Sequence, residues 1–398
     1  MEEGNKTFLS RQQIVQHVKK NLLYTPFDVA WVPYTNVLTA VGQYSNNNGA
    51  LSFYRLTEGE LQAVAELRVA HPVRCLTYQH TLVSGGKNEN VNYRGMATTV
   101  AVGDFVGSLH LYDVERLVGL GEKNTNKSDS YNYVITDPAE AATFSAPHAH
   151  SSIINCMDGA RAYGPPELAT GSRDGSVRVW DCRQSAKPIV SLNPPSNNNN
   201  NNTTNVRDCW AVALGNSHDP DERVLSCGYD NGDVKLFDLR TNKMLHEMNV
   251  GNGVCGLEFD RKDIPMNKLY ISMLEGRVRC VDVRTCHSKL GYAYVDERCS
   301  NGTVWSTRVL PQNREVFMAG GGGELILRQY EYPPERERKD QDGVPMGVAG
   351  KVNALNTVKV GDQPINALDW NRGKEGLLAC ASLDQSLRVM LVTRLNLL

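Results

Sequence analysis

The feature that most restricts what this chain can fold into is a short hairpin pattern that recurs along its whole length. The clearest copy, Leu168–Arg183, reads as an apolar strand, a tight turn at Asp174 and Gly175, and a second strand that ends in Trp-Asp. In the second strand Val177 and Val179 alternate with polar residues, which is typical of a half-buried strand. Asp-Gly between two such runs favours a hairpin turn, because glycine tolerates a positive φ.

Seven copies of this hairpin follow one another along the chain, namely Thr39–Leu56, Val100–Val114, Leu168–Arg183, Val224–Arg240, Leu269–Arg284, Val316–Tyr332 and Leu377–Leu395. The first six turns carry the glycines Gly49, Gly107, Gly175, Gly232, Gly276 and Gly323, and the seventh carries Gln385. An apolar run precedes each hairpin, and a fourth run follows every hairpin except the last. Four strands per unit, with Trp-Asp ending the third, resemble the WD40 repeat of β-propellers.

We therefore expect an all-β chain that forms a single seven-bladed WD40 β-propeller. The predicted blades occupy residues 27–67, 71–136, 150–193, 206–250, 252–296, 302–360 and 363–398. The run Tyr131–Thr136 is predicted to be the outer strand of the second blade. The polar segments between the apolar runs are predicted to be loops, at Lys87–Gly95, Gly119–Ser130, Pro194–Asn205 and Pro333–Gly350. The asparagine run at 197–202 is predicted to be disordered.

The last blade lacks a strand, because the chain stops at Leu398 directly after the third strand of the seventh unit. An open edge there would leave backbone N–H and C=O groups unpaired. Within the N-terminal segment, residues 1–26, the run Gln13–Lys20 alternates like a strand, although a short amphipathic helix is the alternative over so few residues. We expect residues 13–20 to complete the seventh blade and close the ring.

Composition limits the functions that such a ring can have. The net charge of −2 over 398 residues gives no basic surface for nucleic acid or for an anionic membrane. No apolar run is long enough to span a bilayer, and the first residues lack the pattern of a signal peptide. Ten cysteines occur without a C-x-x-C pair, which favours reduced thiols over disulfides or zinc. We expect a cytoplasmic monomer.

In the third unit, several residues resemble the hydrogen-bond relay of WD repeats. His150 is predicted to reach Asp174 in the turn, and the hydroxyl of Thr170 or Ser172 and the indole of Trp180 complete the relay. Buried polar groups must be paired, so we interpret these residues as structural. We expect the relay to be complete only in the third blade, because the other units replace Trp180 by Tyr54, Tyr112, Phe237, Val281, Arg328 and Met390.

Candidate partner-binding residues lie where propellers usually bind, on the face where first strands begin and hairpins turn. The second position of the first-strand pattern carries Asp28, Arg74, Asn155, Trp210, Cys255, Trp305 and Asn366. Tryptophan and arginine are enriched in interface hot spots. The candidates are Trp210, Trp305 and Arg74, together with the residues before the turns, Phe105, Arg173 and Asp230. Packing between blades is the alternative for both tryptophans.

Three units end in Asp-x-Arg, with the arginines Arg183, Arg240 and Arg284. This pattern resembles the motif by which WD-repeat substrate receptors dock on cullin-4 ubiquitin ligases. The alternative, which we favour, is that each arginine pairs with the carboxylate or backbone of its own blade.

Motifs of catalysis or metal binding are not recognisable. His148 and His150 lack a third ligand at metal-site spacing, and Gly320–Gly323 lacks the Lys-Ser/Thr of a phosphate loop. We therefore expect neither an enzyme nor a bound cofactor or metal.

Longer segments carry a more specific resemblance, at Arg207–Asn216, Cys227–Arg240, Asn252–Leu269, Thr303–Glu315 and Tyr330–Gly350. Together they resemble the Monad-type family of WD-repeat axonemal dynein assembly factors, over nearly the full chain. The resemblance implies a cytoplasmic co-chaperone adaptor for the preassembly of dynein arms. It implies RuvB-like ATPases, prefoldin-like subunits, dynein heavy chains and other assembly factors as partners. A substrate receptor of a cullin-4 type ubiquitin ligase is the alternative function.

Overall fold

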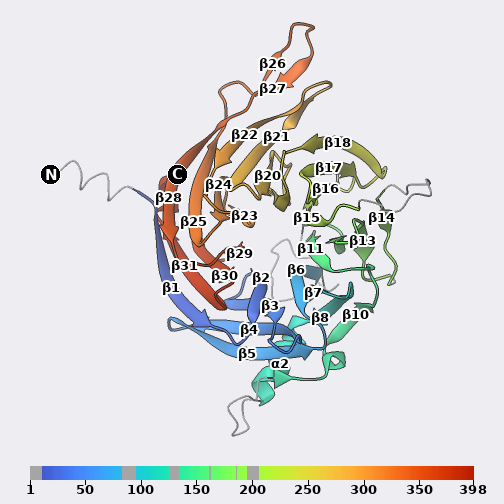
Figure 1. Cartoon of the computed structure of the whole chain (residues 1–398), viewed down its shortest axis with the longest axis vertical. Coiled ribbons are helices and arrows are strands. Elements are labelled where there is room, and N and C mark those ends of the chain that lie inside the picture. Colours follow the sequence, from blue (N-terminus) through green and yellow to red (C-terminus); the bar gives the residue numbers. More distant parts are fainter. Residues whose placement is uncertain (1–10, 83–95, 125–133, 161–162, 185, 195–205) are drawn as a thin grey trace, which may run out of the picture.

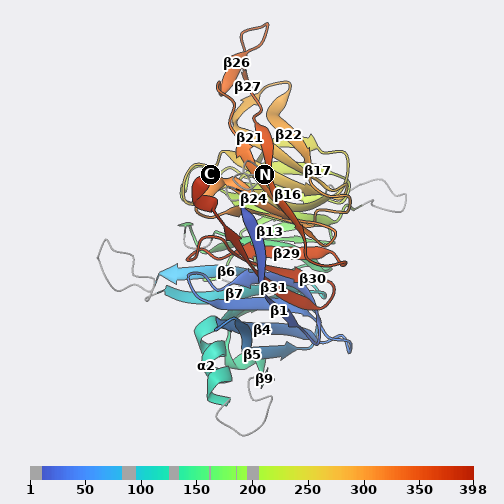
Figure 2. The same ribbon diagram turned by 90° about the vertical axis from the view of Figure 1, so that its left-hand side faces the viewer.

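Each repeated hairpin has apolar side chains that must be buried. All of them are buried when the sheets pack side by side in a closed ring. The computed structural model, which describes residues 11–82, 96–124, 134–160, 163–184, 186–194 and 206–398, has this arrangement. Seven four- or five-stranded sheets are arranged around a central channel. Figures 1 and 2 show this ring face-on and edge-on. The predicted all-β, seven-bladed propeller is confirmed. The segments predicted at 87–95 and 197–202 lie outside the described residues.

The strands of the first three blades are named here from the channel outward. Blade 1 contains β2 (Thr25–Trp31), β3 (Val37–Gln43), β4 (Gly49–Thr57) and β5 (Glu60–Val69). Blade 2 contains β6 (Val73–Leu82), β7 (Met96–Asp104), β8 (Leu109–Asp113) and β10 (Ala142–Ala146). Blade 3 contains β11 (Ile154–Gly159), β12 (Glu167–Ser172), β13 (Val177–Asp181) and β14 (Val190–Leu192).

The remaining four blades follow the same order. Blade 4 contains β15 (Cys209–Gly215), β16 (Val224–Tyr229), β17 (Asp233–Asp238) and β18 (Lys243–Asn249). Blade 5 contains β19 (Val254–Phe259), β20 (Lys268–Met273), β21 (Arg277–His287) and β22 (Gly291–Arg298). Blade 6 contains β23 (Ser306–Leu310), β24 (Asn313–Gly320), β25 (Glu324–Glu331) and β28 (Lys351–Lys359). Blade 7 contains β29 (Ile365–Trp370), β30 (Leu377–Ser382), β31 (Ser386–Thr393) and β1 (Gln13–Asn21).

The hairpin turns between second and third strands use the left-handed backbone region. The φ angle is +84° at Gly107 and +76° at Gly175, and Gln385 adopts +58° at the same place in the seventh turn. That conformation costs a residue with a Cβ about 1 kcal/mol. The first turn differs from the prediction, because Asn47 rather than Gly49 has the positive φ, at +65°.

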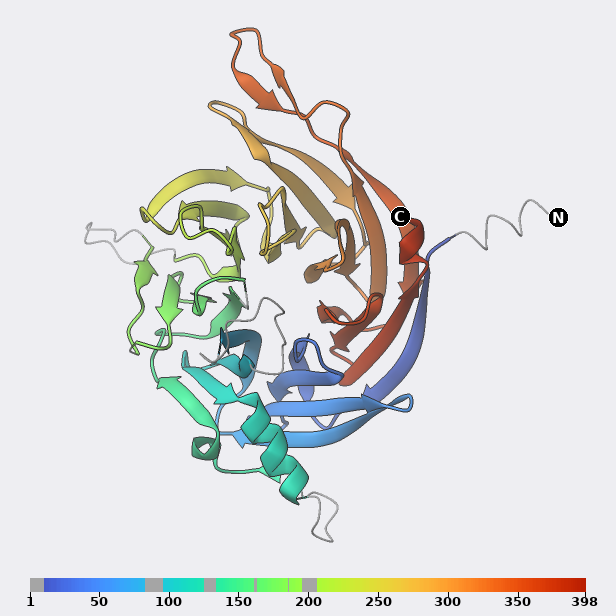
Figure 3. The same cartoon turned by 180° about the vertical axis from the view of Figure 1, so that it is seen from behind.

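The ring is closed by a strand from the N-terminal end of the chain. β1 pairs antiparallel with β31 along its length, and Figure 3 shows the two ends of the colour scale side by side there. Ile14 and Val18 are buried against the seventh blade, whereas Val15 is 48% exposed. The predicted closing strand is therefore confirmed, and the helix alternative for Gln13–Lys20 is wrong.

The outer strand of the second blade is not the one that the sequence predicted. Within Tyr131–Thr136, the described part forms β9 (Val134–Ile135), which pairs in parallel with β5 of blade 1. The outer position of blade 2 belongs instead to β10, which pairs with β8. The cause is a helix after β8 that carries the chain across to the outer edge of blade 1.

This helix, α2 (Val114–Asn124), includes part of a segment predicted to be a loop. Its buried residues Val114, Leu117 and Gly121 recur at helical spacing, and the first two join the hydrophobic cluster shared by blades 1 and 2. Asp113 caps it by accepting the backbone N–H of Arg116 at 2.9 Å. Two short 3-10 helices lie at Pro138–Glu140 and Leu395–Leu397.

The segment Pro333–Gly350, predicted to be a loop, contains a small hairpin of β26 (Glu337–Lys339) and β27 (Pro345–Gly347). It contacts β21 and β22 and projects from the ring at the end opposite to α2 (Figures 1 and 2). Thr285 Oγ1 donates to Glu337 Oε2 at 3.1 Å, and His287 Nε2 lies 2.9 Å from Asp340 Oδ2. These bonds fasten the hairpin to the end of blade 5.

Candidate partner-binding site at the channel mouth

The third blade contains a continuous chain of polar side chains behind its hairpin turn. Trp180 Nε1 donates to Thr170 Oγ1 at 2.9 Å, and this hydroxyl lies 2.8 Å from His150 Nε2. His150 Nδ1 lies 3.3 Å from Asp174 Oδ2 and 3.0 Å from Ser176 Oγ. His150, Thr170 and Trp180 are each at most 1% exposed, so these bonds tie the preceding loop to the blade.

Ser172, the other hydroxyl considered for the relay, bonds elsewhere. It donates to the carbonyl of Ser152 at 3.2 Å and accepts the N–H of Asp174 at 3.1 Å. Burial lowers the pKa of His150, so the imidazole is neutral and Nδ1–H donates toward Asp174. Burial alone would raise the pKa of Asp174, but bonds from His150 and Ser176 hold it well below its usual range. Each side chain of the relay therefore forms its hydrogen bonds within blade 3 and the loop that precedes it.

The channel opens into a cavity on one face of the ring, the turn face, where first strands begin and hairpins turn. The second position of the first-strand pattern contributes one lining residue from every blade, namely Asp28, Arg74, Asn155, Trp210, Cys255, Trp305 and Asn366. Three of the predicted partner-binding residues, Trp210, Trp305 and Arg74, therefore surround the same opening, which we call the mouth.

One side of the mouth fastens neighbouring blades through polar side chains. Asn366 Nδ2 donates to the carbonyl of Phe27 at 3.0 Å across the boundary of blades 7 and 1. Asp28 Oδ2 accepts the N–H of Leu76 at 3.0 Å across the next boundary. Asn155 Nδ2 donates at 3.0 Å to the first carbonyl of β15 in blade 4. These residues are structural, although they line the cavity.

The other side of the mouth, in blades 4 to 6, presents Trp210, Cys255 and Trp305. Among the described residues, none of these three side chains donates a hydrogen bond to a neighbouring blade. Both tryptophans are half-buried, whereas the other three of the chain are at most 2% exposed: Trp31, Trp180 and Trp370. Burial raises the pKa of Cys255 to about 12, so its thiol is unreactive.

Phe105 and Arg74 meet on the rim of blade 2. The Phe105 ring packs against Phe27 with centroids 5.5 Å apart, and the Arg74 guanidinium lies 5.6 Å from the centroid of Phe27. Phe27 is therefore a shared platform that holds both predicted residues at the mouth.

The other two rim candidates, Arg173 and Asp230, lie near Asp208 at the start of blade 4. Arg173 Nε lies 3.6 Å from Asp208 Oδ2. Burial raises the pKa of Asp208, Arg173 and Trp210 oppose that rise, and the charge of Asp230 adds to it. Asp230 Oδ1 is buried and accepts no hydrogen bond from the described residues. This rim therefore combines negative charge with one exposed guanidinium.

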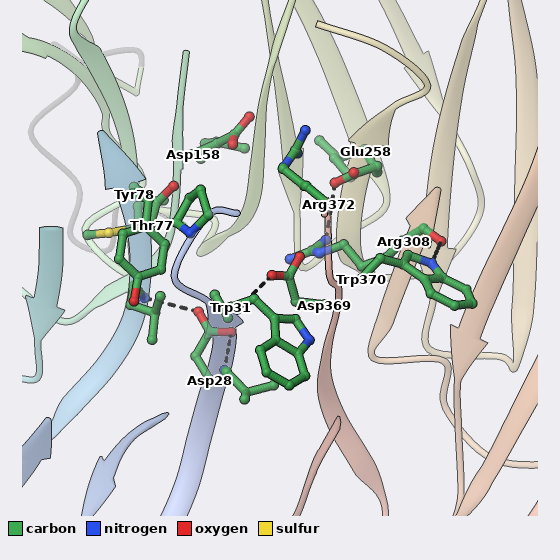
Figure 4. Close-up of a pocket in the computed structure, with 17 residues that line it drawn as sticks. Asp28, Trp31, Thr77, Tyr78, Asp158, Glu258, Arg308, Asp369, Trp370 and Arg372 are labelled. Carbon is green, nitrogen blue, oxygen red and sulfur yellow. Dashed lines mark hydrogen bonds and ion pairs between the residues drawn. The ribbon is translucent and has the colours of Figure 1, made fainter. Parts of the chain in front are cut away.

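Below the mouth the channel narrows to a second cavity lined by charged residues (Figure 4). Arg308 lines both cavities, and its Nη1 lies 3.3 Å from Glu258 Oε2. Asp369 Oδ2 accepts the N–H of Trp31 at 2.9 Å, and Trp370 Nε1 donates to the carbonyl of Arg308 at 3.1 Å (Figure 4). These bonds join the first strands of adjacent blades.

Sequence reasoning missed this inner ring, although a signal for it exists. Four of its charged residues, Asp158, Glu258, Arg308 and Asp369, follow the mouth position of their blade by three residues. This spacing is recognisable only when the first strands of the seven units are aligned. In a single strand, a charged residue usually indicates a face that is exposed to solvent.

The Asp-x-Arg arginines do not share one environment. Arg183 Nη2 lies 2.8 Å from Asp181 Oδ2, and Arg284 Nε lies 2.8 Å from Asp282 Oδ1. Arg240 is exposed, and no side-chain bond from it is formed among the described residues. Two of the three arginines thus pair with the carboxylate of their own motif, as the favoured alternative predicts.

The mouth presents indole surfaces, a guanidinium and amide groups, and tryptophan and arginine are enriched in interface hot spots. Over the described part of the chain, no group of three or more His, Cys, Asp or Glu residues could hold a metal ion. In the same residues no helix has the length and apolarity to cross a bilayer.

Comparison with known proteins gives one family-model match and several relatives that match nearly the full chain. A family model described as the nucleolar protein 10-like N-terminal domain matches residues 58–296. Dynein axonemal assembly factor 10 of Bos taurus is 41% identical over 97% of this chain and 98% of its own length, and the Homo sapiens relative gives the same values. The Chlamydomonas reinhardtii relative is 43% identical over 97% of this chain and 98% of its own length. On this similarity, the chain belongs to the dynein axonemal assembly factor 10 family of WD-repeat propellers.

Proposed function

We propose that this protein is a non-enzymatic scaffold for the cytoplasmic preassembly of axonemal dynein arms. The observation that carries the proposal is its similarity to dynein axonemal assembly factor 10 over 97% of the chain. A closed propeller holds its loops at fixed positions, so several partners can be bound at once without catalysis. The partner classes follow from the family resemblance: RuvB-like ATPases, prefoldin-like subunits, other assembly factors and dynein heavy chains.

The partner surface that we propose is the mouth and its rim. Trp210 and Trp305 offer half-buried indoles that make no bond across a blade boundary, and Arg74 lies at the same cavity. The rim adds Phe105, Arg173 and Asp230. Removing a hot-spot tryptophan typically costs about 2 kcal/mol or more of binding free energy.

Depletion in a ciliated cell tests the proposed function. We expect cilia that are present but immotile, with dynein arms missing and unassembled heavy chains degraded. Precipitation of the tagged protein should recover RuvB-like ATPases and dynein heavy chains from cytoplasm and not from finished axonemes. Normal dynein arms after complete depletion would contradict the proposal.

Replacement of the depleted protein with variants tests the surface. We expect the double variant Trp210→Ala, Trp305→Ala to fold with an unchanged melting temperature and to lose most of the recovered partners. Tyr294→Ala is the matched control, because Tyr294 is 49% exposed on the outer strand of blade 5. Early melting of both single variants would assign the tryptophans to packing between blades instead.

A cullin-4 ubiquitin-ligase receptor is the less favoured function, because Arg183 and Arg284 are already paired within their own motifs. Reversal of charge at Arg183, Arg240 and Arg284 tests it. If this variant keeps its partners and its fold, the Asp-x-Arg motifs have only a structural role within their blades. If the wild type recovers a cullin-4 adaptor and the variant does not, the ubiquitin-ligase function is favoured.

A further inference from the structure

One charged side chain at the mouth, that of Arg74, forms no ion pair with the described residues. The other charged residues that line the mouth are Asp28 and Arg308, and Arg308 is paired with Glu258 of the cavity below. Charge complementarity at a concave site steers and orients partners of opposite sign.

The single carboxylate is already engaged by the backbone. Asp28 Oδ1 accepts the N–H of Val29 at 2.8 Å, and Oδ2 accepts the N–H of Leu76 at 3.0 Å. Burial raises the pKa of Asp28, although both N–H groups and both arginines oppose that rise. Both carboxylate oxygens of Asp28 therefore accept backbone N–H groups, and neither bonds to Arg74.

The two arginines differ in how they are held. Arg308 is paired with Glu258 at 3.3 Å and donates to its neighbouring carbonyl, of Thr307, at 3.2 Å. Arg74 lies over the ring of Phe27 and forms no hydrogen bond or ion pair with the described residues. Its planar fork of N–H donors is thus available at the mouth, on a fixed aromatic platform.

The apolar side of the mouth lies in blades 4 to 6. Trp210 and Trp305 come from the blades on either side of Cys255 and Gly256, which are small and leave room between the indoles. The acidic rim formed by Asp208 and Asp230 belongs to blade 4 and is faced by the guanidinium of Arg173. The unpaired guanidinium therefore comes from blade 2, and the apolar surface comes from blades 4 to 6.

We propose that the mouth binds an extended acidic segment of a protein partner, with an Asp or Glu side chain held by Arg74 and adjacent apolar side chains against Trp210 and Trp305. This inference rests on the proposed scaffold function for the claim that the occupant is a protein. A guanidinium and a carboxylate form a bidentate, charge-assisted pair. Apolar neighbours of the carboxylate pack against the indoles of Trp210 and Trp305 on the other side of the mouth.

Short peptides test the chemistry on the purified full chain. The probe is acetyl-Gly-Leu-Asp-Leu-Gly-amide, and the matched peptides replace Asp by Asn, Asp by Lys, or both Leu by Gly. Fluorine NMR of protein labelled with fluorotryptophan reads out all five tryptophans, and Trp210→Phe and Trp305→Phe assign the two signals of interest. We expect saturable shifts of these two signals with the Asp peptide at constant ionic strength, and at least about tenfold weaker binding of the matched peptides.

Arg74→Gln should weaken the Asp peptide about tenfold and leave the Asn peptide unchanged, because it removes one charged contact. Arg116→Gln is the matched control: Arg116 is exposed on helix α2, outside the mouth lining. Melting temperatures verify that both variants fold. Equal or tighter binding of the Lys or Asn peptide overturns the proposal, and so does the absence of saturable shifts with every peptide.

The peptide experiment and the cellular experiment can fail separately. If no peptide binds while depletion still removes dynein arms, the scaffold function stands and the acidic segment is wrong. If the Asp peptide binds through Arg74 while arms are normal after depletion, the mouth has the proposed chemistry and serves another protein.

Discussion

The hairpin turns of blades 3 and 7 share one sequence pattern. They differ in the residue that donates hydrogen bonds to the aspartate of the turn. Ser172–Ser176 and Ser382–Ser386 both place an aspartate between two serines, at Asp174 and Asp384. In both turns the second serine donates its hydroxyl to the aspartate. The aspartates then need a further donor, because each carboxylate is only partly exposed.

The two blades take that donor from different places. In blade 3 it is the neutral imidazole of His150, which lies 24 residues before Asp174 and is itself bonded to Thr170. In blade 7 it is the guanidinium of Arg388, whose Nη2 lies 2.6 Å from Asp384 Oδ2 and which is 1% exposed.

Blade 7 therefore has no relay. The positions of Thr170 and Trp180 are occupied by Cys380 and Met390, as the strand register shows. The closing strand adds Lys19, whose Nζ lies 3.7 Å from the carboxylate of Asp384.

The comparison indicates which blade is more sensitive to the loss of one residue. Leaving a buried charge without its partner costs about 3–5 kcal/mol, whereas an unpaired neutral group costs about 1–3 kcal/mol. Blade 7 depends on a charged pair and on a strand from the other end of the chain. Blade 3 depends on a relay of mostly neutral groups, so single substitutions there should be less damaging.

Removal of the closing strand should have the largest effect. Deletion of residues 1–21 leaves β31 without its partner and exposes the side of blade 7 that Ile14 and Val18 cover. We expect insoluble protein, or a melting temperature lowered by several degrees or more. An unchanged melting curve for the truncated protein would contradict the role of β1 in closing the ring.

Arg388→Met should have the next largest effect. The change removes the guanidinium from the Asp384 carboxylate and leaves it Lys19 and the hydroxyls of Ser382 and Ser386, so we expect the free energy of unfolding to fall by about 3 kcal/mol. The double variant Arg388→Met, Asp384→Asn should recover much of this loss, because it removes the unpaired charge as well. Denaturant midpoints of the three proteins measure both changes. A double variant that is less stable than Arg388→Met would show that the pair is not what Arg388 provides.

His150→Ala should destabilise the protein less, by roughly 2 kcal/mol, because Thr170 loses a neutral partner and Asp174 keeps the N–H of Ser151 at 2.9 Å. His218→Ala is the matched control, since His218 is exposed in a loop of blade 4. A loss larger than that of Arg388→Met would reverse the ranking of the two blades.

The repeat allowed the ring to be predicted from local signals. Turn glycines and alternating valines such as Val177 and Val179 depend only on neighbouring residues, so they give the number of blades and the hairpin register. The mouth residues Trp210 and Trp305 could also be predicted, because aligned first strands of a propeller place equivalent positions around one channel. Their contact with a partner remains a prediction.

Features that depend on distant residues could not be predicted in this way. The role of Arg388 requires the position of Asp384 across a folded turn, and the pattern of a WD relay directs attention to Trp180 instead. β9 joins blade 1 because α2 crosses to β5, which is a contact between separate blades. The helix itself had a local signal, the Asp113 cap before Val114 and Leu117 at helical spacing, and the prediction of a loop overlooked it.

The smallest expected difference between the two blades is in their response to pH. Burial lowers the pKa of His150 below its ordinary value of about 6.5, so the unfolded chain binds this proton more readily. The contribution of the neutral imidazole is fully present above about pH 6.5 and is lost as the pH falls toward the folded-state pKa. Burial would raise the pKa of Asp384, but Arg388 and Ser386 hold it at about 2, so that contribution is lost only as the pH falls below about 4.

Lowering the pH from 7.5 to 5.5 should therefore weaken blade 3 and leave blade 7 unchanged. We expect the stability difference between the wild type and His150→Ala to shrink by about 1 kcal/mol or less over this range. As the pH falls, the unfolded wild type gains a proton on His150 before the folded wild type does, and this lowers the stability of the wild type. The variant lacks the imidazole and is not affected in this way. The difference between the wild type and Arg388→Met should stay constant, since both members of that pair remain charged. Urea unfolding of the three proteins at each pH measures both differences. A widening gap for His150→Ala would mean that the histidine is stabilised in its charged form by Asp174, and the relay would then resemble the ion pair of blade 7.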